Sequence, residues 1–540
     1  MTIYKLGCIW GKGAPDFYEM IKSKNISLSH ISDCNPKKNS VILITNGHTV
    51  KAITILLEDC QPVTNNPELK DSFDEYRISY NNETLYAKSK WIELKPEDYF
   101  LFKTQDGICQ IHKQEIHQIT KSLMSKYMLN ENLNKQIELL KYKKQIILQG
   151  PPGTGKTKTA KDIAVEMLGL GNVQVLNNNE QFKLIQFHPS YTYEDFVRGI
   201  VSVPNEDGEG VLFKTENKIL AEFAEKALKN KLDSQKGPTE LSKEKWLNEQ
   251  FEKFIYSVSE ILEVNEKIEL TESVVIIEID EDAFRYKGVK GWTKKGNRML
   301  FKDIKQAYLD ENFERQDLKH NHNLSGLAKW HASYYVRVLD MFKSFLKENK
   351  IDFIANTTQK EELKNYVLII DEINRANLPS VLGELIYALE YRDEPVESMY
   401  EYDGKREIIL PSNLYIIGTM NTADRSVGHI DYAIKRRFAF VDILPSDQAI
   451  DDVVTDADLN AKAKGLYHKV AELFNEDTDK TVYLQSDFKA KDVQLGHSYF
   501  LVETEKQLEL KLEFEIKPLL NEYVKDGILS EAASNEITSL

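Results

Sequence analysis

The sequence predicts an α/β fold built on a parallel sheet that helices wrap, and three observations support this expectation. Apolar runs of strand length occur at Gln145–Leu148, Tyr366–Ile370 and Leu414–Gly418. A glycine-rich loop, GPPGTGKT, follows the first run directly and leads into a helical pattern that continues through Leu168. A second helical pattern, Ser380–Glu390, separates the other two runs. Strands that alternate with helices are typical of a parallel sheet, because each parallel connection needs a crossover element.

Length and composition are those of a globular protein with several domains. The chain has 540 residues, more than a single hydrophobic core usually serves. Apolar residues make up 41% and charged residues 29% of the chain, a balance typical of globular proteins. No apolar run approaches the roughly 18 residues of a membrane span, and the N-terminus lacks the pattern of a signal peptide. We therefore expect a cytoplasmic protein that does not contact a membrane.

The cysteines point to the same compartment. The four cysteines are Cys8, Cys34, Cys60 and Cys109, and none of them forms a CxxC pair. This pattern excludes a disulfide scaffold, argues against a zinc site and is typical of a reducing environment.

The charge is acidic and unevenly distributed. The formal net charge is −15, which argues against a protein that coats nucleic acid without specificity. Residues 446–540 contain 10 Lys and Arg against 20 Asp and Glu, whereas residues 1–115 contain 14 against 15. Nucleic-acid binding through the N-terminal part therefore remains open.

The pattern along the chain divides it into four regions. Residues 1–115 contain short alternating strands and are expected to form a small β-rich N-terminal module. Residues 116–144 have helical periodicity and suit a connector. Residues 145–445 hold the α/β core, which a less regular stretch, about 230–364, interrupts as an inserted α+β segment. Residues 446–540 form a mostly helical C-terminal region.

The N-terminal module is expected to contain a tight hairpin. Asn46-Gly47 lies between two β patterns, and this dipeptide favours the two-residue turn of an antiparallel pair. Phe17–Lys22 has the pattern of a short helix. The expected strands are Ser40–Leu43, Val50–Leu57, Arg77–Tyr80 and Trp91–Leu94.

The glycine-rich loop has the GxxxxGK[ST] spacing of a phosphate loop, after a strand and before a helix as that motif requires. Its residues are Gly150, Pro151, Pro152, Gly153, Thr154, Gly155, Lys156 and Thr157. Glycines allow backbone N–H groups to surround phosphate oxygens, and the helix N-terminus adds a partial positive charge. We expect Lys156 to reach the β- and γ-phosphates of a nucleotide and the Thr157 hydroxyl to bind Mg²⁺.

Three further patterns suit the same chemistry. Asp371 ends an apolar strand, where its carboxylate can bind Mg²⁺ or its waters, and Glu372 beside it can polarise an attacking water. Asn421 ends the next strand run and can hold that water near the γ-phosphate. Arg436 and Arg437 lie in a basic run at a helix end. An acidic strand end and a solvated basic face are the alternative interpretations of the first and third patterns.

Together these motifs make the chain resemble a known family. The phosphate loop, DEINRAN (371–377), MNTADRS (420–426) and KRRF (435–438) are similar to the McrB family of AAA+ motor subunits, which serve modification-dependent restriction systems. MNTADRS distinguishes this family from other AAA+ ATPases. The segments QFHPSYTYEDF (186–196) and LGHSYF (495–500) agree with it. The resemblance covers about 145–228 and 360–525.

The resemblance implies an AAA+ P-loop NTPase core with a helical lid, assembled as a ring, expected to be a hexamer, with nucleotide at the subunit boundaries. It implies GTP as the nucleotide, although related AAA+ proteins use ATP and no guanine-reading residue is evident. By position, Asp371 and Glu372 would be the Walker B pair and Asn421 the polar sensor, with Asp424 and Arg425 completing the family loop. Arg436 and Arg437 would be the arginine-finger candidates. The expected partners are DNA, modified in some systems, and a separate McrC-type nuclease subunit.

Three segments outside these motifs are less specific. Glu278–Asp282 and Lys287 contain the residue types of a restriction nuclease but not their order, and a solvated turn fits better. The stretch 286–298 could contact phosphates or be a plain solvated loop. Five apolar residues of the insertion, four aromatic and one valine, fall at helical spacings of three or four and are expected to pack in a core. They are Trp330, Tyr334, Tyr335, Val338 and Phe342.

The N-terminal module could read DNA. Family motors carry varied DNA-reading modules there, several of them β-barrels of the PUA/EVE kind. Its aromatic residues could hold a flipped base, or they could be ordinary core of a β domain. Docking of another protein and reading of unmodified DNA are the other possibilities. The aromatic residues are Trp10, Tyr18, Tyr80, Tyr86 and Trp91.

Two functions are consistent with these motifs. The first is an NTP-hydrolysing motor subunit of a McrBC-type antiviral restriction complex that acts on DNA. The second is a MoxR-like AAA+ ATPase that remodels protein complexes. Hydrolysis stimulated by DNA would favour the first function, and hydrolysis indifferent to DNA would favour the second.

Overall fold

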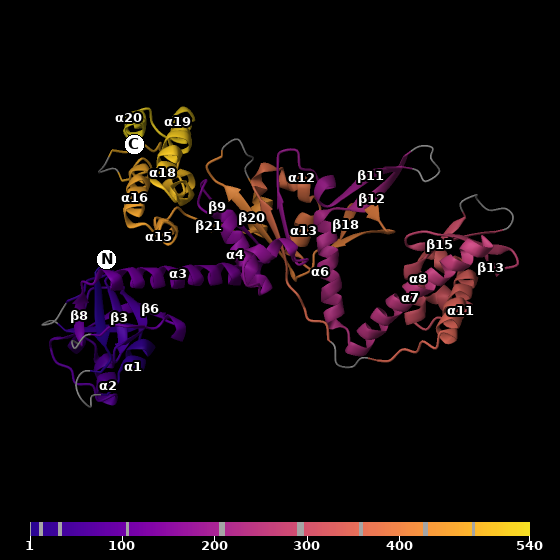
Figure 1. Ribbon diagram of the computed structural model, residues 1–540, viewed down its shortest axis with the longest axis horizontal. Helices are drawn as coiled ribbons and strands as arrows, with labels where there is room; N and C mark the ends of the chain where they lie inside the picture. Colours follow the sequence, from indigo (N-terminus) through magenta and orange to yellow (C-terminus); the bar gives the residue numbers. More distant parts are fainter. Residues whose placement is uncertain are drawn as a thin grey trace.

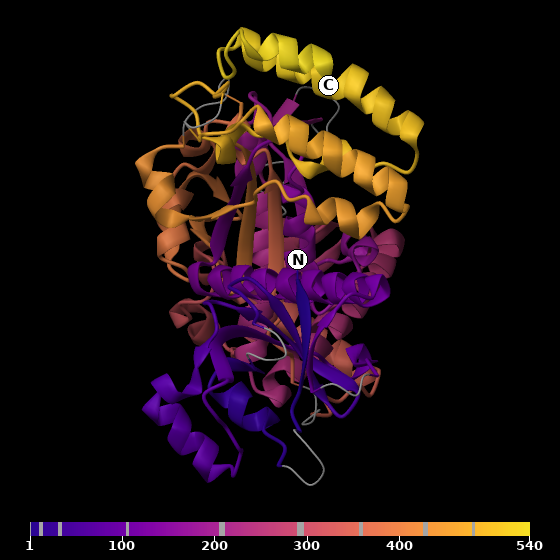
Figure 2. The ribbon, with the colours of Figure 1, turned by 90° about the vertical axis from the view of Figure 1, so that its left-hand side faces the viewer.

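The computed structural model describes residues 2–9, 15–30, 35–103, 107–204, 211–288, 296–355, 360–424, 430–477 and 481–540. A central sheet lies between an inserted subdomain at one end of the long axis and the N-terminal module with the C-terminal helices at the other (Figure 1). Seen from that second end, the C-terminal helices lie above the central sheet and the N-terminal module lies below it (Figure 2).

The N-terminal module is a mixed sheet with strand order β2-β6-β4-β3-β1-β8. β1 runs parallel to β3, and the other neighbours in this order are antiparallel. Its elements are β1 (Ile3–Gly7), α1 (Tyr18–Ser23), β2 (Ile26–His30), β3 (Val41–Asn46), β4 (Thr49–Leu56), β5 (Gln61–Pro62), α2 (Pro67–Glu75), β6 (Thr84–Glu93), β7 (Phe100–Leu101) and β8 (Ile108–Ile111). Buried apolar side chains cover both faces of this sheet.

The hairpin predicted from Asn46-Gly47 is confirmed. β3 and β4 pair antiparallel with Asn46 opposite Thr49, and Gly47 has a φ of 62°. Glycine adopts this left-handed conformation without the steric cost that a Cβ would add. The short helix expected at Phe17–Lys22 is also confirmed, as α1.

The strand expected at Arg77–Tyr80 is wrong, because this segment closes helix α2. Arg77 has a φ of 56°, and the amide of Ile78 donates a hydrogen bond to the carbonyl of Phe73 at 2.8 Å. A left-handed residue followed by such a bond is a common helix terminus. The strand expected at Trp91–Leu94 is part of the longer strand β6, which begins at Thr84 and ends at Glu93.

Helix α3 (Gln114–Lys143) confirms the helical pattern of the connector and is fastened to the N-terminal module. The hydroxyl of Tyr127 donates to the carboxylate of Asp98 at 2.8 Å, and the ammonium of Lys126 lies 2.7 Å from the same carboxylate. α3 ends where Lys144 adopts a φ of 69°, and the first core strand starts at the next residue. The connector therefore leads directly into the strand that carries the phosphate loop.

The core is a parallel five-stranded sheet with the order β10-β17-β20-β9-β21. Its strands are β9 (Gln145–Gly150), β10 (Phe182–Gln186), β17 (Tyr366–Asp371), β20 (Leu414–Asn421) and β21 (Ala439–Asp442), so the three predicted strand runs are confirmed. α3 and α4 (Lys156–Leu168) cover one face, with Ile146, Leu148 and Ile163 in the core between them. The other face packs against α6 (Ile219–Gln235), α12 (Leu378–Leu382), α13 (Leu385–Glu390) and α14 (Tyr432–Arg437).

The helix predicted at Ser380–Glu390 is interrupted. α12 ends before Gly383, which has a φ of 52°, and α13 begins two residues later. A Cβ on Gly383 would come within 3.2 Å of the Tyr193 ring. The glycine thus allows α12 and α13 to turn around that ring.

Two hairpins extend from the core and are joined by one buried arginine. They are formed by β11 (Arg198–Pro204) with β12 (Val211–Asn217), and by β18 (Pro395–Tyr402) with β19 (Lys405–Ile409); the short helix α5 (Tyr193–Phe196) precedes the first. Arg198 is 4% exposed, and its guanidinium donates to the side chain of Asn217 and to the carbonyls of Tyr400, Arg406 and Glu407.

The insertion folds around a core of its own. Its elements are α7 (Pro238–Asn265), β13 (Ile268–Thr271), β14 (Val274–Ile279), β15 (Ala283–Gly288), β16 (Asn297–Leu300), α8 (Phe301–Leu309), α9 (Arg315–His320), α10 (Gly326–Trp330) and α11 (Ala332–Glu348). Tyr335, Val338 and Phe342 are fully buried, as predicted, and Tyr334 packs at the edge of this core. The same prediction is wrong for Trp330, which is 86% exposed. It ends α10, and the break before α11 removes it from the buried stripe.

The C-terminal region is helical and has a separate core. It consists of α15 (Gln448–Val453), α16 (Ala457–Glu472), α17 (Ala490–Val493), η5 (His497–Phe500), α18 (Glu505–Lys511), α19 (Lys517–Lys525) and α20 (Ala533–Ser539). Among the described residues, none of the helices combines the length and apolar character needed to cross a membrane.

Candidate nucleotide-binding site

Strand order brings the sequence motifs to one edge of the core sheet. β9 ends at Gly150, β17 ends at Asp371, and β20 lies between them and ends at Asn421. Gly150 and Asn421 are direct neighbours across β9 and β20. Because all five strands are parallel, these residues meet at the carboxyl edge, where open α/β sheets bind their ligands.

The phosphate loop has the backbone that its glycines predict. Gly153 and Gly155 have φ values of 79° and 81°, and α4 starts at the next residue, Lys156. A Cβ on Gly153 would lie 2.6 Å from the Ser498 hydroxyl, so this position also requires glycine for space. The loop thus ends at a helix N-terminus whose free N–H groups can bind an anion.

Lys156 folds back over the loop. Its ammonium donates to the carbonyls of Gly150 at 2.9 Å and Pro151 at 2.7 Å. Burial lowers the pKa of Lys156 to about 8, and the charges of Glu372 and Asp371 offset only part of this effect. The cation is therefore held by neutral carbonyls, and an incoming phosphate would supply the counter-charge that it lacks.

Asp371 binds two hydroxyl groups through a single carboxylate oxygen. Thr157 donates to its Oδ1 at 2.8 Å, and Thr419 donates to the same atom at 2.5 Å. Sequence reasoning did not identify Thr419, a buried polar residue inside the apolar strand β20. The hydroxyl of Thr157 and the carboxylate of Asp371 are oxygen ligands of the kind that Mg²⁺ prefers beside phosphates and water.

Glu372 is held in an unusual conformation by its neighbours. Its φ is 53°, its amide donates to the Thr419 hydroxyl at 3.2 Å, and its carboxylate accepts a hydrogen bond from Arg375 at 3.2 Å. Left-handed backbone outside glycine is costly and is concentrated at functional sites. Arg375 also lies 3.8 Å from the carboxylate of Asp424. This arginine of DEINRAN, which sequence reasoning did not single out, links two predicted site residues.

Asn421 and Asn374 present buried polar atoms to this edge. The side-chain oxygen of each has no hydrogen-bond partner among the described residues. Asn374 donates to the backbone carbonyl of Asn421 at 3.4 Å. Buried polar groups are nearly always satisfied, so such atoms mark a place for water or ligand. Arg425, predicted to complete this loop, lies outside the described residues.

Arg436 and Arg437 lie at the opposite edge of the sheet. The side chain of Gln145, the first residue of β9, donates to the backbone carbonyl of Arg437 at 2.7 Å, and Lys143 donates to that of Arg436. β9 has 6 residues, which at about 3.3 Å each puts the phosphate loop roughly 17 Å away. These arginines are therefore remote from the phosphate loop of their own subunit.

The two arginines differ in exposure. The side chain of Arg436 is 65% exposed and lies 3.3 Å from Glu390. The side chain of Arg437 is only 9% exposed and contacts Glu390 as well as the carbonyl of Ala433, at 2.9 Å. Arg436 can thus reach another molecule, whereas Arg437 is part of the packing of α14.

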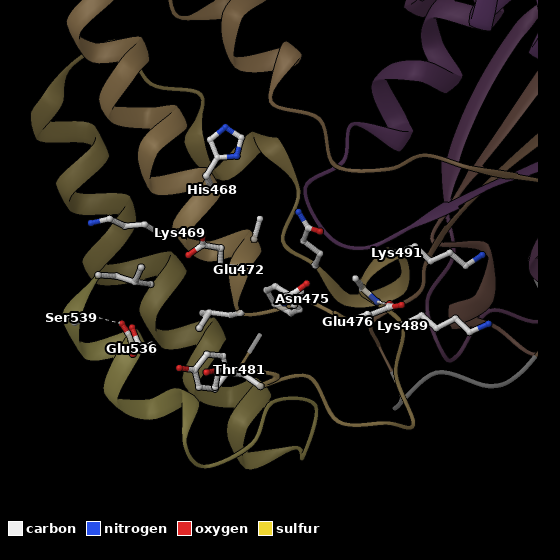
Figure 3. Close-up of a pocket in the computed structure, with 17 residues that line it drawn as sticks. His468, Lys469, Glu472, Asn475, Glu476, Thr481, Lys489, Lys491, Glu536 and Ser539 are labelled. Atoms are coloured by element: carbon white, nitrogen blue, oxygen red, sulfur yellow. Dashed lines mark hydrogen bonds between the residues drawn. The ribbon is translucent and has the colours of Figure 1, made fainter. Parts of the chain in front are cut away.

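Cavities lie between the core and the C-terminal helices and also within those helices. One, of about 900 Å³, is lined by Asn374, Asn421 and Asp424 from the core and by Lys491 and Asp492 of α17. A larger one, of about 1240 Å³, lies within the C-terminal helices and is lined by residues such as His468, Glu472 and Glu536 (Figure 3); none of its lining residues belongs to the phosphate loop. Of these two cavities, the smaller one borders the carboxyl edge of the core sheet at Asn421.

The aromatic residues of the N-terminal module that could hold a flipped base pack within the module where the structure describes them. Tyr18 and Trp91 pack edge to face at 5.8 Å, and the Trp91 indole donates to the carbonyl of Ile26. Tyr86 is 7% exposed and Tyr80 packs on Phe73. Trp10, and residues 289–295 of the basic stretch, lie outside the described residues. Among the residues that are described, no cluster of three or more His, Cys, Asp or Glu could hold a metal ion.

Two family matches agree with this geometry. Residues 302–438 match the AAA domain of the dynein-related subfamily, a range that includes Asp371, Asn421 and Arg437. Residues 483–528 match the alpha-helical lid domain of McrB, which includes the LGHSYF segment. Together with the phosphate loop and the strand order, these matches define an AAA+ nucleotide-binding protein with a helical lid.

Two components of restriction enzymes are similar in sequence to part of this chain. The chain is 37% identical over 179 residues to the type IV methyl-directed restriction enzyme EcoKMcrB subunit of Escherichia coli (strain K12), a match that covers 30% of this chain and 38% of that protein. It is 39% identical over 95 residues to the type II restriction enzyme BsuMI component YdiS of Bacillus subtilis (strain 168), covering 15% and 27%. The chain is an McrB-like AAA+ subunit that matches less than half the length of either relative.

Proposed function

We propose that this chain is the nucleoside triphosphate-hydrolysing motor subunit of a McrBC-type restriction complex, acting on DNA in antiviral defence. The main support for this proposal is that the expected site residues lie at two opposite edges of the core sheet. Lys156, Thr157, Asp371, Glu372 and Asn421 gather at one edge of the sheet, while the exposed arginine lies at the opposite edge. A ring, expected to be a hexamer, would bring the two edges of neighbouring subunits together.

The residues of the carboxyl edge suit phosphoryl transfer to water. Lys156 would bind the β- and γ-phosphates, and Thr157 with Asp371 would hold Mg²⁺, which neutralises charge on the phosphate oxygens. Glu372 would orient the attacking water and accept its proton, since Arg375 holds its carboxylate in place. The unpartnered oxygen of Asn421 would accept a hydrogen bond from the same water.

Arg436 is the better candidate for the arginine that acts in the neighbouring subunit. It is exposed, whereas Arg437 is nearly buried and bonded within α14. Charge on the transferring phosphate is stabilised most strongly by a cation that the site otherwise lacks. Hydrolysis is therefore expected to depend on assembly, and the isolated subunit is expected to be slow.

Phosphate release is the first test of this function. Purified protein with Mg²⁺ is expected to hydrolyse GTP in preference to ATP, Lys156→Ala to be inactive, and Lys226→Ala, which changes an exposed lysine on α6, to match the wild type. Glu372→Gln is expected to bind nucleotide but to hydrolyse it about 100-fold more slowly. Activity that survives Lys156→Ala would rule the site out. A preference for ATP that does not respond to DNA would favour a MoxR-like remodelling ATPase, which the dynein-related match of the core also allows.

We expect no nuclease activity from this chain alone, so that DNA cleavage requires a separate McrC-type subunit. The candidate cluster at 278–282 supports this expectation. Asp280 accepts hydrogen bonds from Arg285 at 2.6 Å and Arg298 at 2.8 Å, so its carboxylate is engaged in ion pairs. Incubation of methylated and unmethylated plasmid DNA with purified protein, nucleotide and Mg²⁺ should leave both intact. Cleavage that is lost in Asp280→Asn would contradict this expectation.

The N-terminal module is the proposed DNA-contacting part, because its charge is nearly balanced while the C-terminal region is strongly acidic. Tyr18, Tyr80 and Trp91 are engaged in packing, so a base reader would use other groups of the module.

A further inference from the structure

A segment of the lid lies directly on the phosphate loop. The amide of Gly496 donates to the carbonyl of Pro152 at 2.9 Å, and the amide of Ser498 donates to the carbonyl of Gly153 at 3.0 Å. The segment is anchored in the lid, because Leu495 and Phe500 are buried in the lid core. Two main-chain hydrogen bonds therefore connect the lid with the loop that is expected to bind phosphate.

The contact is so close that only glycine fits. A Cβ on Gly496 would overlap the carbonyl group of Gly153 and the amide nitrogen of Thr154, all at less than the 3.0 Å that real Cβ contacts keep. These are backbone atoms, which cannot rotate away. On the other side, a Cβ on Gly153 would lie 2.8 Å from the Tyr499 ring. Each glycine thus makes room for the other segment.

Peptide geometry links this contact to phosphate binding. In a trans peptide the C=O and N–H groups point in opposite directions, and the described chain contains no cis peptide. The carbonyls of Pro152 and Gly153 point to the lid, so the N–H groups of Gly153 and Thr154 point away from it. The lid contact therefore fixes the direction in which two amide donors of the phosphate loop point, and backbone N–H groups of such loops are the donors that bind phosphate.

The lid segment that contacts the phosphate loop is held in place by further bonds within the lid. The ammonium of Lys511, on α18, donates to the carbonyls of Ser498 at 3.0 Å and Leu501 at 3.1 Å. His497 lies over Gly155, and its Nδ1 is buried without a partner among the described residues. Burial and the nearby charge of Lys158 lower the pKa of His497, so the protonated imidazole is disfavoured beside the loop.

We propose that Gly496 is a positioning residue for the bound nucleoside triphosphate: through it the lid orients the amide groups of the phosphate loop, and lid docking is thereby coupled to nucleotide affinity. This inference rests on the proposed function, because it assumes that the loop binds nucleotide. By linkage, nucleotide must in turn strengthen the docking of the lid.

Gly496→Ala tests the coupling, with Gly465→Ala as its matched control. Gly465 is also in the lid, on α16, but a Cβ there would meet nothing within 4 Å. Titration with mant-GTP and mant-ATP should show a Kd at least tenfold higher for Gly496→Ala, and a Kd within twofold of the wild type for Gly465→Ala. An unchanged Kd for a folded Gly496→Ala protein would overturn the inference.

Lys511→Met is a second, milder variant for the case in which Gly496→Ala does not fold. It keeps the apolar stem of the side chain and removes the donors that brace the turn, so we expect a Kd about threefold higher. A wild-type Kd in this variant would also overturn the inference. In both variants the measurement is made on the full chain.

Hydrogen exchange provides a readout that a purely structural role would not change. Nucleotide should slow exchange at the amides of Gly496 and Ser498 in the wild type, and should not do so in Lys156→Ala. Exchange that does not respond to bound nucleotide would contradict the coupling. If Lys156→Ala binds nucleotide like the wild type, the proposed function itself fails; if it loses binding while Gly496→Ala keeps it, only the coupling fails.

Discussion

Lys156→Met is expected to abolish nucleotide hydrolysis and, at the same time, to stabilise the nucleotide-free protein. The ammonium is buried against two carbonyls, and its lowered pKa of about 8 reports that the folded state disfavours its charge. Methionine keeps a similar stem without the charge. Each carbonyl retains another donor, since the amide of Thr422 bonds to Gly150 and the hydroxyl of Thr154 bonds to Pro151. We expect the free energy of unfolding to rise by about 1 kcal/mol.

The stability of the wild type is expected to rise with pH, because the pKa of Lys156 is lowered in the folded state. Below pH 8 the lysine is charged in both the folded and the unfolded states, and the full cost of burying the charge is present. Between pH 8 and its ordinary value of 10.5 the folded protein loses the proton first, so the wild type gains stability as the pH rises. The advantage of Lys156→Met should therefore be largest below pH 8 and shrink above it.

Urea unfolding of nucleotide-free protein in magnesium-free buffer, at pH 7 and at pH 10, measures both effects. Lys226→Met, which changes an exposed lysine on α6, serves as the control and should alter neither stability nor hydrolysis. A variant less stable than the wild type at pH 7 would show that the two hydrogen bonds of Lys156 outweigh the cost of its burial.

Arg436→Ala is expected to lower nucleotide turnover, whereas Arg437→Ala is expected to lower the stability of the subunit. The side chain of Arg436 is exposed and forms an ion pair with Glu390. Its removal should leave the subunit folded and lower the turnover of the assembled protein by about 10³-fold. The side chain of Arg437 is nearly buried and bonded to Ala433 and Glu390. Its removal should destabilise the subunit by about 2 kcal/mol.

Mixing experiments separate the two roles. An Arg436→Ala subunit retains its own phosphate loop, and a Lys156→Ala subunit retains its own arginine, so mixed assemblies should recover part of the activity that neither variant has alone. Arg315→Ala, at an exposed arginine of the insertion, is the control and should be active and stable. No recovery in mixtures, with both proteins folded and assembled, would contradict a role of Arg436 in the neighbouring subunit.

Local patterns were sufficient for much of the fold and the site. The strand of the phosphate loop, the connector helix and the Asn46-Gly47 hairpin each depend on residues close together in the chain, so periodicity and turn chemistry predict them. The expected strand at Arg77–Tyr80 was wrong because a helix terminus competed for it. Trp330 was misplaced because helical spacing does not reveal where one helix ends and another begins.

Local sequence alone predicts the expected nucleotide-binding motifs: a glycine-rich loop before Lys156 and Thr157, and an apolar strand that ends in Asp371 and is followed by Glu372. Which distant residues lie beside these motifs depends on how the elements pack. Strand order places Thr419 beside Asp371, and the packing of α14 buries one arginine of an adjacent pair and exposes the other. The close approach of Gly496 to Gly153 also results from the packing of distant segments. Such contacts join residues far apart in the chain, so they are set by how the elements pack and leave no local pattern.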